Sequence, residues 1–225
     1  MALRYFRNTG STSYSVTTNW SATDGGVSVG AVPTAADDVY FTSNSGNCVI
    51  NATSVAKTIT CTGYIGTISG SSQLTVSGSI TLVSGMGWTY TGNLIINAAS
   101  TILLAGKAIT QLTLSNVAIT INPSDSVISL CTISQVGSTI QFASNALIKS
   151  LISIASTSAS HNIIKSSSVG VKRQLGVFSA DLSFVDFTDI DATLGPTVRT
   201  YKGVISNCFN VVNMIPPTQK GNINF

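Results

Sequence analysis

Apolar and polar residues alternate in short runs along the middle of the chain, and the runs return with a period of about 20 residues. In one series an apolar residue is followed by another two positions later, and the pairs begin at Leu74, Leu94, Leu112, Cys131 and Ile152. The spacing between successive pairs is nearly constant, as their residue numbers show. Because positions i and i+2 of a strand lie on the same face, each pair predicts a strand with one buried face.

A second series of apolar pairs lies between the members of the first. Its pairs begin at Val39, Ile59, Ile80, Ile102, Ile119 and Ile140, and they recur with nearly the same period. Two such strands in each period predict one coil of a β-solenoid. We therefore expect an all-β fold, a β-solenoid or parallel β-helix, that is nearly free of helix over residues 39–154. One interior file should contain Leu74, Leu94, Leu112 and Cys131, with adjacent coils about 4.8 Å apart.

The composition favours the same fold class. Only 8% of the 225 residues are charged, against roughly 25% in ordinary soluble domains. The chain has no Glu and is rich in Ser and Thr. A chain with few Lys residues and many Thr, Val and Ile residues forms strands more readily than helices.

The amount and distribution of charge indicate which classes of molecule the chain can bind. The net charge of +3 comes from scattered basic residues, whereas a nucleic-acid-binding protein normally presents a basic stripe. We therefore expect no nucleic-acid partner. Low surface charge permits association, so we expect a homo-oligomer that packs against other proteins.

The repeat divides the chain into three parts. Residues 1–36 lack the repeat and are predicted to form an N-terminal cap or docking segment, residues 37–155 the solenoid coils, and residues 156–225 the final coils and a C-terminal cap. The open ends of a solenoid expose apolar interior and unpaired backbone, which capping segments cover. We assign Trp20 to the N-terminal cap as a buried plug, Asp37 and Asp38 to the turn that enters the first coil, and Phe225 to the C-terminal end.

The segment around Trp88 and Tyr90 interrupts the repeat with two aromatic residues. We interpret it as a corner at which both rings pack over the coil. The alternative is an exposed platform on which a sugar ring stacks.

Four aspartates near the C-terminal end are the strongest candidates for chemistry. Asp181, Asp186, Asp189 and Asp191 could hold calcium or act as acid and base, as in β-helix lyases and hydrolases. By strand alternation Asp189 and Asp191 share a face and Asp186 does not. We expect all four to be strand-end or surface residues without a basic partner, and Leu182, Phe184 and Phe187 to face inward.

No other motif in the sequence supports catalysis. His161 stands alone in the sequence, and the four cysteines have no metal-binding spacing. Two of the cysteines, Cys61 and Cys131, occupy apolar positions of the repeat and are predicted to be buried with free thiols. We expect no enzyme activity, no catalytic residue, no metal and no cofactor.

Two sequence features bear on location. Residues 1–7 lack the apolar core of a signal peptide, and the chain has no apolar run of 18 or more residues that would predict a transmembrane helix. We therefore expect synthesis in the cytoplasm and no membrane partner.

The entry into the repeat resembles the opening of β-helix proteins from the virions of tailed bacteriophages. The resemblance is carried by Asn19-Trp20-Ser21, Gly25-Gly26 and the segment Pro33-Thr34-x-x-Asp37-Asp38-Val39-x-Phe41. Residues 161–166, 182–189 and 221–225 are similar to the ends of such proteins, although their Trp-rich closing segment is only weakly matched. The resemblance implies a virion structural protein of a tail, a fibre or the capsid surface. It assigns no catalytic residue.

We therefore expect a non-enzymatic structural component of a phage virion whose partners are other virion proteins and further copies of itself. The alternative is a receptor-binding tailspike-type β-helix that binds or depolymerises a host-surface glycan. A bacterial surface adhesin is disfavoured because no export signal is visible.

Overall fold

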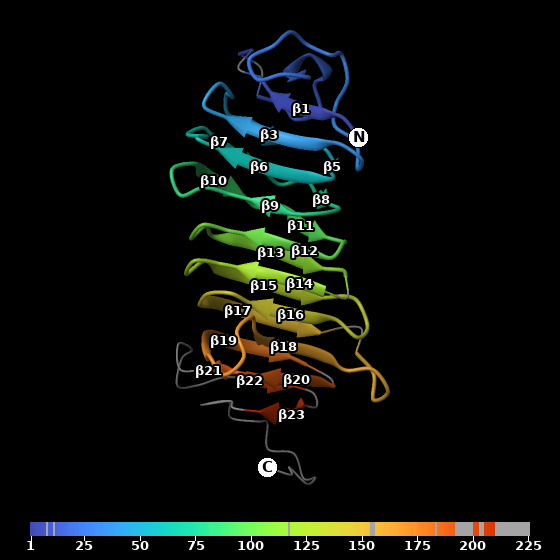
Figure 1. Ribbon diagram of the computed structural model, residues 1–225, viewed down its shortest axis with the longest axis vertical. Helices are drawn as coiled ribbons and strands as arrows, with labels where there is room; N and C mark the ends of the chain where they lie inside the picture. Colours follow the sequence, from blue (N-terminus) through green and yellow to red (C-terminus); the bar gives the residue numbers. More distant parts are fainter. Residues whose placement is uncertain are drawn as a thin grey trace.

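The computed structural model describes residues 1–7, 9–10, 12–116, 118–153, 156–182, 184–191, 200–202 and 205–209. These residues form an all-β solenoid of about eight coils with about 20 residues per turn. The coils stack along one long axis, with the N-terminus at one end (Figure 1). In the described part, the helical structure is one short 3-10 turn, η1 (Thr17–Asn19), which lies outside the interval predicted to be helix-free. The predicted fold class is confirmed.

The strands form three sheets, which we number 1 to 3. Sheet 1 has eleven strands in the order β2 (Trp20–Ser21), β1 (Leu3–Phe6), β3 (Asp38–Thr42), β6 (Thr58–Thr62), β9 (Ile80–Thr81), β12 (Ser100–Leu103), β14 (Ala118–Asn122), β16 (Thr139–Phe142), β18 (Asn162–Ser166), β20 (Val185–Thr188) and β23 (Ile205–Phe209). Sheet 2 has three strands, β4 (Cys48–Ile50), β7 (Thr67–Gly70) and β10 (Gly87–Tyr90). Sheet 3 contains β5 (Ser54–Ala56), β8 (Leu74–Val76), β11 (Asn93–Ile96), β13 (Ile109–Leu114), β15 (Val127–Ile133), β17 (Ala146–Ser153), β19 (Arg173–Asp181) and β21 (Ile190–Asp191), with β22 (Thr200–Lys202) paired beside β19.

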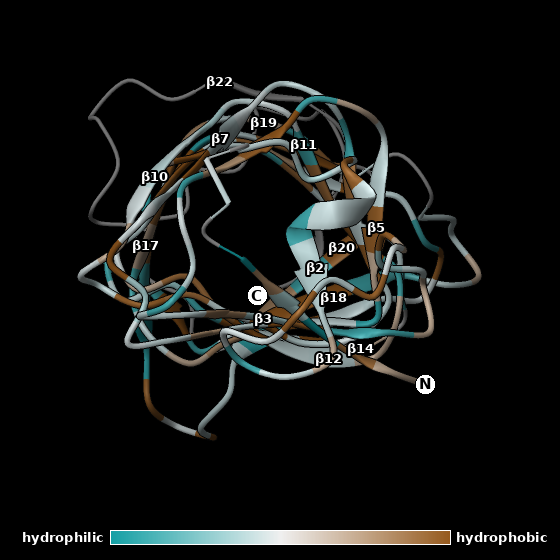
Figure 2. Cartoon of the chain, turned by 90° about the horizontal axis from the view of Figure 1, so that it is seen from above, coloured by the Kyte–Doolittle hydropathy of each residue, from teal (hydrophilic) through white to brown (hydrophobic). Residues whose placement is uncertain are grey.

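Neighbouring strands in each sheet come from successive coils and pair in parallel, whereas β2 pairs antiparallel with β1. Seen along the long axis, the chain closes into a ring (Figure 2). Alternate residues of each strand point into this ring, and the buried apolar side chains form one hydrophobic core.

The predicted interior file is present. Leu74, Leu94, Leu112 and Cys131 are successive partners in sheet 3, and all four are buried. The file continues to Leu151 in β17. The alternation of the sequence therefore identifies the residues that fill this side of the core.

Two details of the predicted register are wrong. Leu151, not Ile152, continues the first series. Ile152 is half-exposed, and Ser153 is buried with its hydroxyl accepting a hydrogen bond from Nδ2 of Asn162 at 2.9 Å. In the second series, Ile102 pairs with Ile121 and not with Ile119. With Ile121 in place of Ile119, the shortest spacing between successive pairs disappears, and the spacings along the second series become more even.

The cross-section changes along the axis. The first three coils each have a separate strand in sheet 2, and β10 is the last strand of that sheet in the described residues. In β13, β15, β17 and β19 the strands of sheet 3 are longer, six to nine residues instead of the three or four of β5, β8 and β11. In β17, two successive residues, Lys149 and Ser150, both point away from the core. One long strand therefore turns a corner there.

Candidate functional site

The N-terminal segment, residues 1–36, lies against the first coil. Its strand β1 pairs in parallel with β3, with Arg4 opposite Val39, and β2 pairs with the outer edge of β1. The sequence did not predict that β1 extends sheet 1. Arg4 occupies the position at which an apolar pair of the second series would begin, so the apolar pattern does not mark β1 as part of the repeat.

An aromatic cluster joins this segment to the solenoid. Trp20 is fully buried, and its ring packs edge-on against Tyr14, Phe6 and Phe41 at centroid distances of 4.7, 5.1 and 6.3 Å. Its indole N–H donates a hydrogen bond to the carbonyl of Tyr14 at 2.8 Å. Because Phe41 belongs to β3, the predicted burial of Trp20 against the first coil is confirmed.

Residues 12–14 follow the outer edge of β4 in sheet 2. The backbone N–H of Tyr14 donates to the carbonyl of Val49 at 3.0 Å, and the N–H of Val49 donates to the carbonyl of Thr12 at 2.6 Å. The Tyr14 hydroxyl donates to the carbonyl of Val55 in sheet 3 at 2.8 Å, and burial raises its pKa well above 10.0. These contacts give partners to backbone groups at the edges of two sheets.

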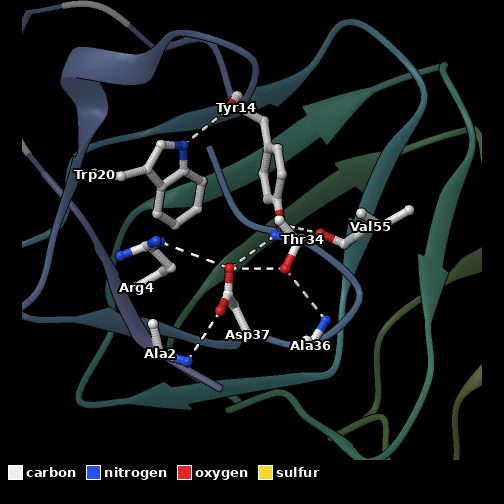
Figure 3. Close-up of polar contacts among 8 residues, drawn as sticks. All are labelled: Ala2, Arg4, Tyr14, Trp20, Thr34, Ala36, Asp37 and Val55. Atoms are coloured by element: carbon white, nitrogen blue, oxygen red, sulfur yellow. Dashed lines mark hydrogen bonds and ion pairs between the residues drawn. The ribbon is translucent and has the colours of Figure 1, made fainter. Parts of the chain in front are cut away.

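Asp37 is a buried carboxylate at the junction between the segment and the first coil (Figure 3). It accepts hydrogen bonds from the N–H of Ala2 at 2.9 Å, and from the N–H and hydroxyl of Thr34 at 3.0 and 2.9 Å. Nε of Arg4 lies 3.7 Å from its Oδ2. Burial opposes its ionisation, but the hydrogen bonds from Thr34 and Ala2 and the charge of Arg4 outweigh burial, and the pKa of Asp37 is lowered from 3.8.

Asp38 makes a second, weaker set of contacts on the outer side of the same turn. Its Oδ1 accepts a hydrogen bond from the Thr58 hydroxyl at 2.8 Å and lies 3.5 Å from Nζ of Lys57. The backbone N–H of Asp38 donates to the carbonyl of Ala2 at 2.9 Å. Asp37 and Asp38 thus both hold residues of β1 or the next coil, and their role in capping stays a prediction.

Trp88 and Tyr90 belong to strand β10 rather than to a corner. Trp88 pairs with Ile68, packs partly against the core and is half-exposed, whereas Tyr90 is buried. The Tyr90 hydroxyl donates to the carbonyls of Ser72 and Asn93 at 2.6 and 3.1 Å. This arrangement matches the packing interpretation and not a pair of exposed rings. Phe225 lies outside the described residues.

The four aspartates do not form one group. Asp181 is exposed at the end of β19, and Asp191 is half-exposed in β21. Asp189 is buried between β20 and β21, with φ of 55°, and accepts a hydrogen bond from the N–H of Gly170 at 2.9 Å. The turn position predicted for Asp189 is confirmed, but the strand breaks there, so Asp189 and Asp191 do not share a face.

The prediction that Asp186 has no basic partner is wrong. Its Oδ1 lies 3.0 Å from Nδ1 of His161, and the His161 ring stacks on Phe184 at a centroid distance of 5.8 Å. Phe184 has φ of 51° and is half-exposed, so it does not face inward as predicted. Residues 25 positions apart meet here because β18 and β20 are neighbouring strands. Sequence spacing alone gave no signal of this contact.

Other chemistry-bearing groups are dispersed. Cys48, Cys61 and Cys131 are buried with free thiols, and burial raises the pKa of Cys131 to about 12. Within the described residues, no three His, Cys or acidic side chains come together as a metal site. The same part of the chain has no helix long and apolar enough to cross a membrane.

Comparisons with protein-family models, with curated proteins and with solved structures found no match to this chain.

The Asp37 contacts predict a pH-dependent loss of stability. Because folding lowers the pKa of Asp37, its contribution is complete above about pH 4 and is lost as the pH falls through the lower folded value. Asp37→Asn should remove about 1.5–3 kcal/mol from the free energy of unfolding near neutral pH, the size of hydrogen bonds to a charged group. Denaturant unfolding followed by circular dichroism from pH 2 to 7 measures both effects.

The matched control for that experiment is Asp125→Asn. Asp125 is exposed in a turn with φ of 63°, a conformation that Asn also tolerates. Its replacement should change the stability by no more than about 0.5 kcal/mol. Equal losses in the two variants would contradict a special role for Asp37.

Proposed function

We propose that this protein is a non-enzymatic structural component of a tailed-phage virion, in a tail, a fibre or on the capsid surface. It would be made in the host cytoplasm and act through contacts with other virion proteins and with further copies of itself. The observation that carries the proposal is the resemblance of residues 19–41 to the opening of such proteins, together with the place of those residues in the fold.

The residues that carry the resemblance make structural contacts where the N-terminal segment meets the first coil. Trp20 fills the aromatic cluster, Asp37 holds Ala2 and Thr34, and Asp38 contacts Thr58 of the next coil. The contacts of Trp20 and Asp37 fix the N-terminal segment on the first coil, and the contact of Asp38 joins the first coil to the second. A segment fixed in this way supports a capping or docking role. A rigid rod that joins other proteins requires such a segment.

The shape of the molecule also supports an assembly role. About eight coils are linked by parallel pairing of strands from coil to coil, and the apolar core is continuous. Such a stack is stiff along its axis because each coil contacts only its neighbours over a full set of backbone hydrogen bonds. Stiffness and length suit a spacer or fibre segment.

One observation favours the alternative, a glycan-processing tailspike. The pair His161–Asp186 lies beside the half-exposed ring of Phe184. A carboxylate that orients a histidine is an arrangement that general acid–base catalysis uses, and an aromatic ring is a surface for sugar stacking. The pair therefore identifies the residues on which a catalytic test should be made.

The catalytic test uses host glycans. Purified protein is incubated with the capsule or lipopolysaccharide of a host strain, and newly released reducing or unsaturated ends are measured. We expect no release above the blank. Sustained turnover that is lost in Asp186→Asn and kept in Asp181→Asn, a matched change at an exposed aspartate, would establish the tailspike function instead.

A further inference from the structure

Sheet 2 stops partway along the solenoid. Its last strand in the described part of the chain is β10, and further coils follow along the axis (Figure 1). Where a fourth strand of sheet 2 would pair with β10, the chain makes a tight turn between β12 and β13, in which Ala105 and Gly106 have φ of 51° and 74°. One edge of β10 therefore has no strand beside it among the described residues.

The backbone bonds of β10 show which of its groups face this edge. The N–H of Gly87 donates to the carbonyl of Gly66 on the β7 side at 2.9 Å. Because the N–H and C=O groups of successive residues in a strand point to opposite sides, those of Trp88 point away from β7, to the unpaired edge. Trp88 is half-exposed and Thr89 is exposed, so this part of β10 lies at the surface.

An unpaired edge of this kind is a template for pairing with another chain. Residues 86–91, with the sequence Met-Gly-Trp-Thr-Tyr-Thr, contain no charged residue and no proline, and Thr, Trp and Tyr favour strands. Short exposed segments with these properties associate as strands. A protein with such an edge needs a group that opposes pairing there.

The side chain of Lys107 lies at the beginning of the unpaired edge. Its Nζ donates hydrogen bonds to the carbonyls of Ser84 and Met86 at 2.8 and 2.6 Å, and Met86 comes directly before β10. Among the described residues Lys107 makes no ion pair, and it is one of two charged residues between positions 58 and 148. Backbone carbonyls, rather than an acidic side chain, therefore hold this charge at the edge.

We infer that Lys107 prevents β10 from pairing with a strand of another molecule. A strand added at this edge would compete with Nζ for the Met86 carbonyl, and it would remove water from an ammonium group without supplying an opposite charge. Two copies that met edge to edge would also bring two ammonium groups together. Lysine blocks association at the edge strands of natural sheets. The inference does not depend on the proposed virion role.

The test variant is Lys107→Met, which keeps the length of the side chain and removes its charge and its hydrogen-bond donors. Sedimentation velocity of the full chain, at concentrations up to about 100 μM, should give a dissociation constant for self-association at least about tenfold below that of the wild type, because the repelling charges are gone. The matched control is Lys149→Met, at an exposed lysine of β17, which should behave as the wild type does. Lys107→Gln, whose amide still donates a hydrogen bond, replaces Lys107→Met if that variant does not fold.

Two further measurements locate the association at β10. Trp20 and Trp88 are the two tryptophans of the chain, and Trp20 is fully buried, so quenching of tryptophan fluorescence by acrylamide reports on Trp88. Association of Lys107→Met should protect Trp88 from quenching. Adding Thr89→Lys to Lys107→Met should restore the wild-type behaviour, because Thr89 is exposed in β10 and the new ammonium group returns charge to this strand.

Four results would overturn the inference: a Lys107 variant that associates no more than the wild type, equal association of Lys149→Met, association that leaves Trp88 open to quenching, or association that persists after Thr89→Lys is added. The last two would place the new contact away from β10. Thermal unfolding followed by circular dichroism verifies that each variant is folded at the temperature of the measurement, so that association of unfolded chains is not counted.

Discussion

Replacing Trp20 by alanine is expected to lower the free energy of unfolding by about 3–5 kcal/mol, the usual loss for a buried aromatic side chain. Trp20 is fully buried and contacts aromatic rings from β1, β3 and the turn at Tyr14. Its removal leaves a cavity between the N-terminal segment and the first coil, and it leaves the carbonyl of Tyr14 without the indole hydrogen bond. Denaturant unfolding followed by far-ultraviolet circular dichroism measures the loss.

Two controls separate the packing of Trp20 from the mere loss of a tryptophan. Trp20→Phe keeps most of the aromatic contact and removes the indole N–H, so it should lose much less than Trp20→Ala. Trp88→Ala removes a half-exposed ring, and a smaller loss is expected because less apolar area leaves the core. Unchanged stability in Trp20→Ala would instead indicate that residues 1–36 are an arm with no part in holding the first coil.

Cys131→Asp is expected to destabilise the solenoid by several kcal/mol near neutral pH, because it places a carboxylate in the apolar interior with no opposite charge. The two side chains are similar in size, so the change tests charge more than volume. The raised pKa of the Cys131 thiol, about 12, shows how strongly this position disfavours a charged group. The control is Thr132→Asp, one residue further along and on the outer face, where the change should be within about 1 kcal/mol.

The pH dependence of that variant has a definite sign. Burial raises the pKa of a carboxyl group in the folded state above its unfolded value of about 3.9. The unfolded chain therefore releases its proton first, and the loss of stability should grow as the pH rises above about 4. A Cys131→Asp protein as stable as wild type, at neutral pH, would contradict the interior file.

The sequence predicted the fold because a solenoid repeats one simple pattern. Each coil must bury alternate residues, so the apolar pairs beginning at Leu74 and Ile80 recur in most of the coils and identify the interior directly. The period of the solenoid could also be predicted from the sequence, since each coil has nearly the same number of residues. These features depend on local alternation, which a sequence displays without knowledge of distant contacts.

The register was predicted less well because apolar residues fit more than one position of the pattern. The run Leu151-Ile152-Ser153 offers apolar residues to both faces, and the structure buries Leu151 and Ser153, with the Ser153 hydroxyl accepting a hydrogen bond from Asn162. In the same way, Ile119 and Ile121 both fit the second series, and in the structure Ile102 pairs with Ile121. Alternation is insensitive to a shift of two residues.

The contacts of the candidate residues could be predicted only in part. Trp20 and Asp37 stood out by type and by position at the start of the repeat, but the partners of Asp37, namely Ala2 and Arg4, became clear only once β1 was placed beside β3. The pair of His161 and Asp186 forms because β18 and β20 are neighbouring strands of sheet 1. Such a contact between neighbouring coils cannot be predicted from the spacing of the residues along the sequence.

The most direct test of the proposed function is to look for this protein in purified phage particles released from cells that carry its gene. Electron cryomicroscopy of those particles, with mass spectrometry to verify the chain, gives both its presence and its copy number. We predict density for a solenoid of about eight coils in repeated, symmetry-related copies on a tail, a fibre or the capsid surface. A chain that is produced during infection but is absent from finished particles would contradict the proposed virion role.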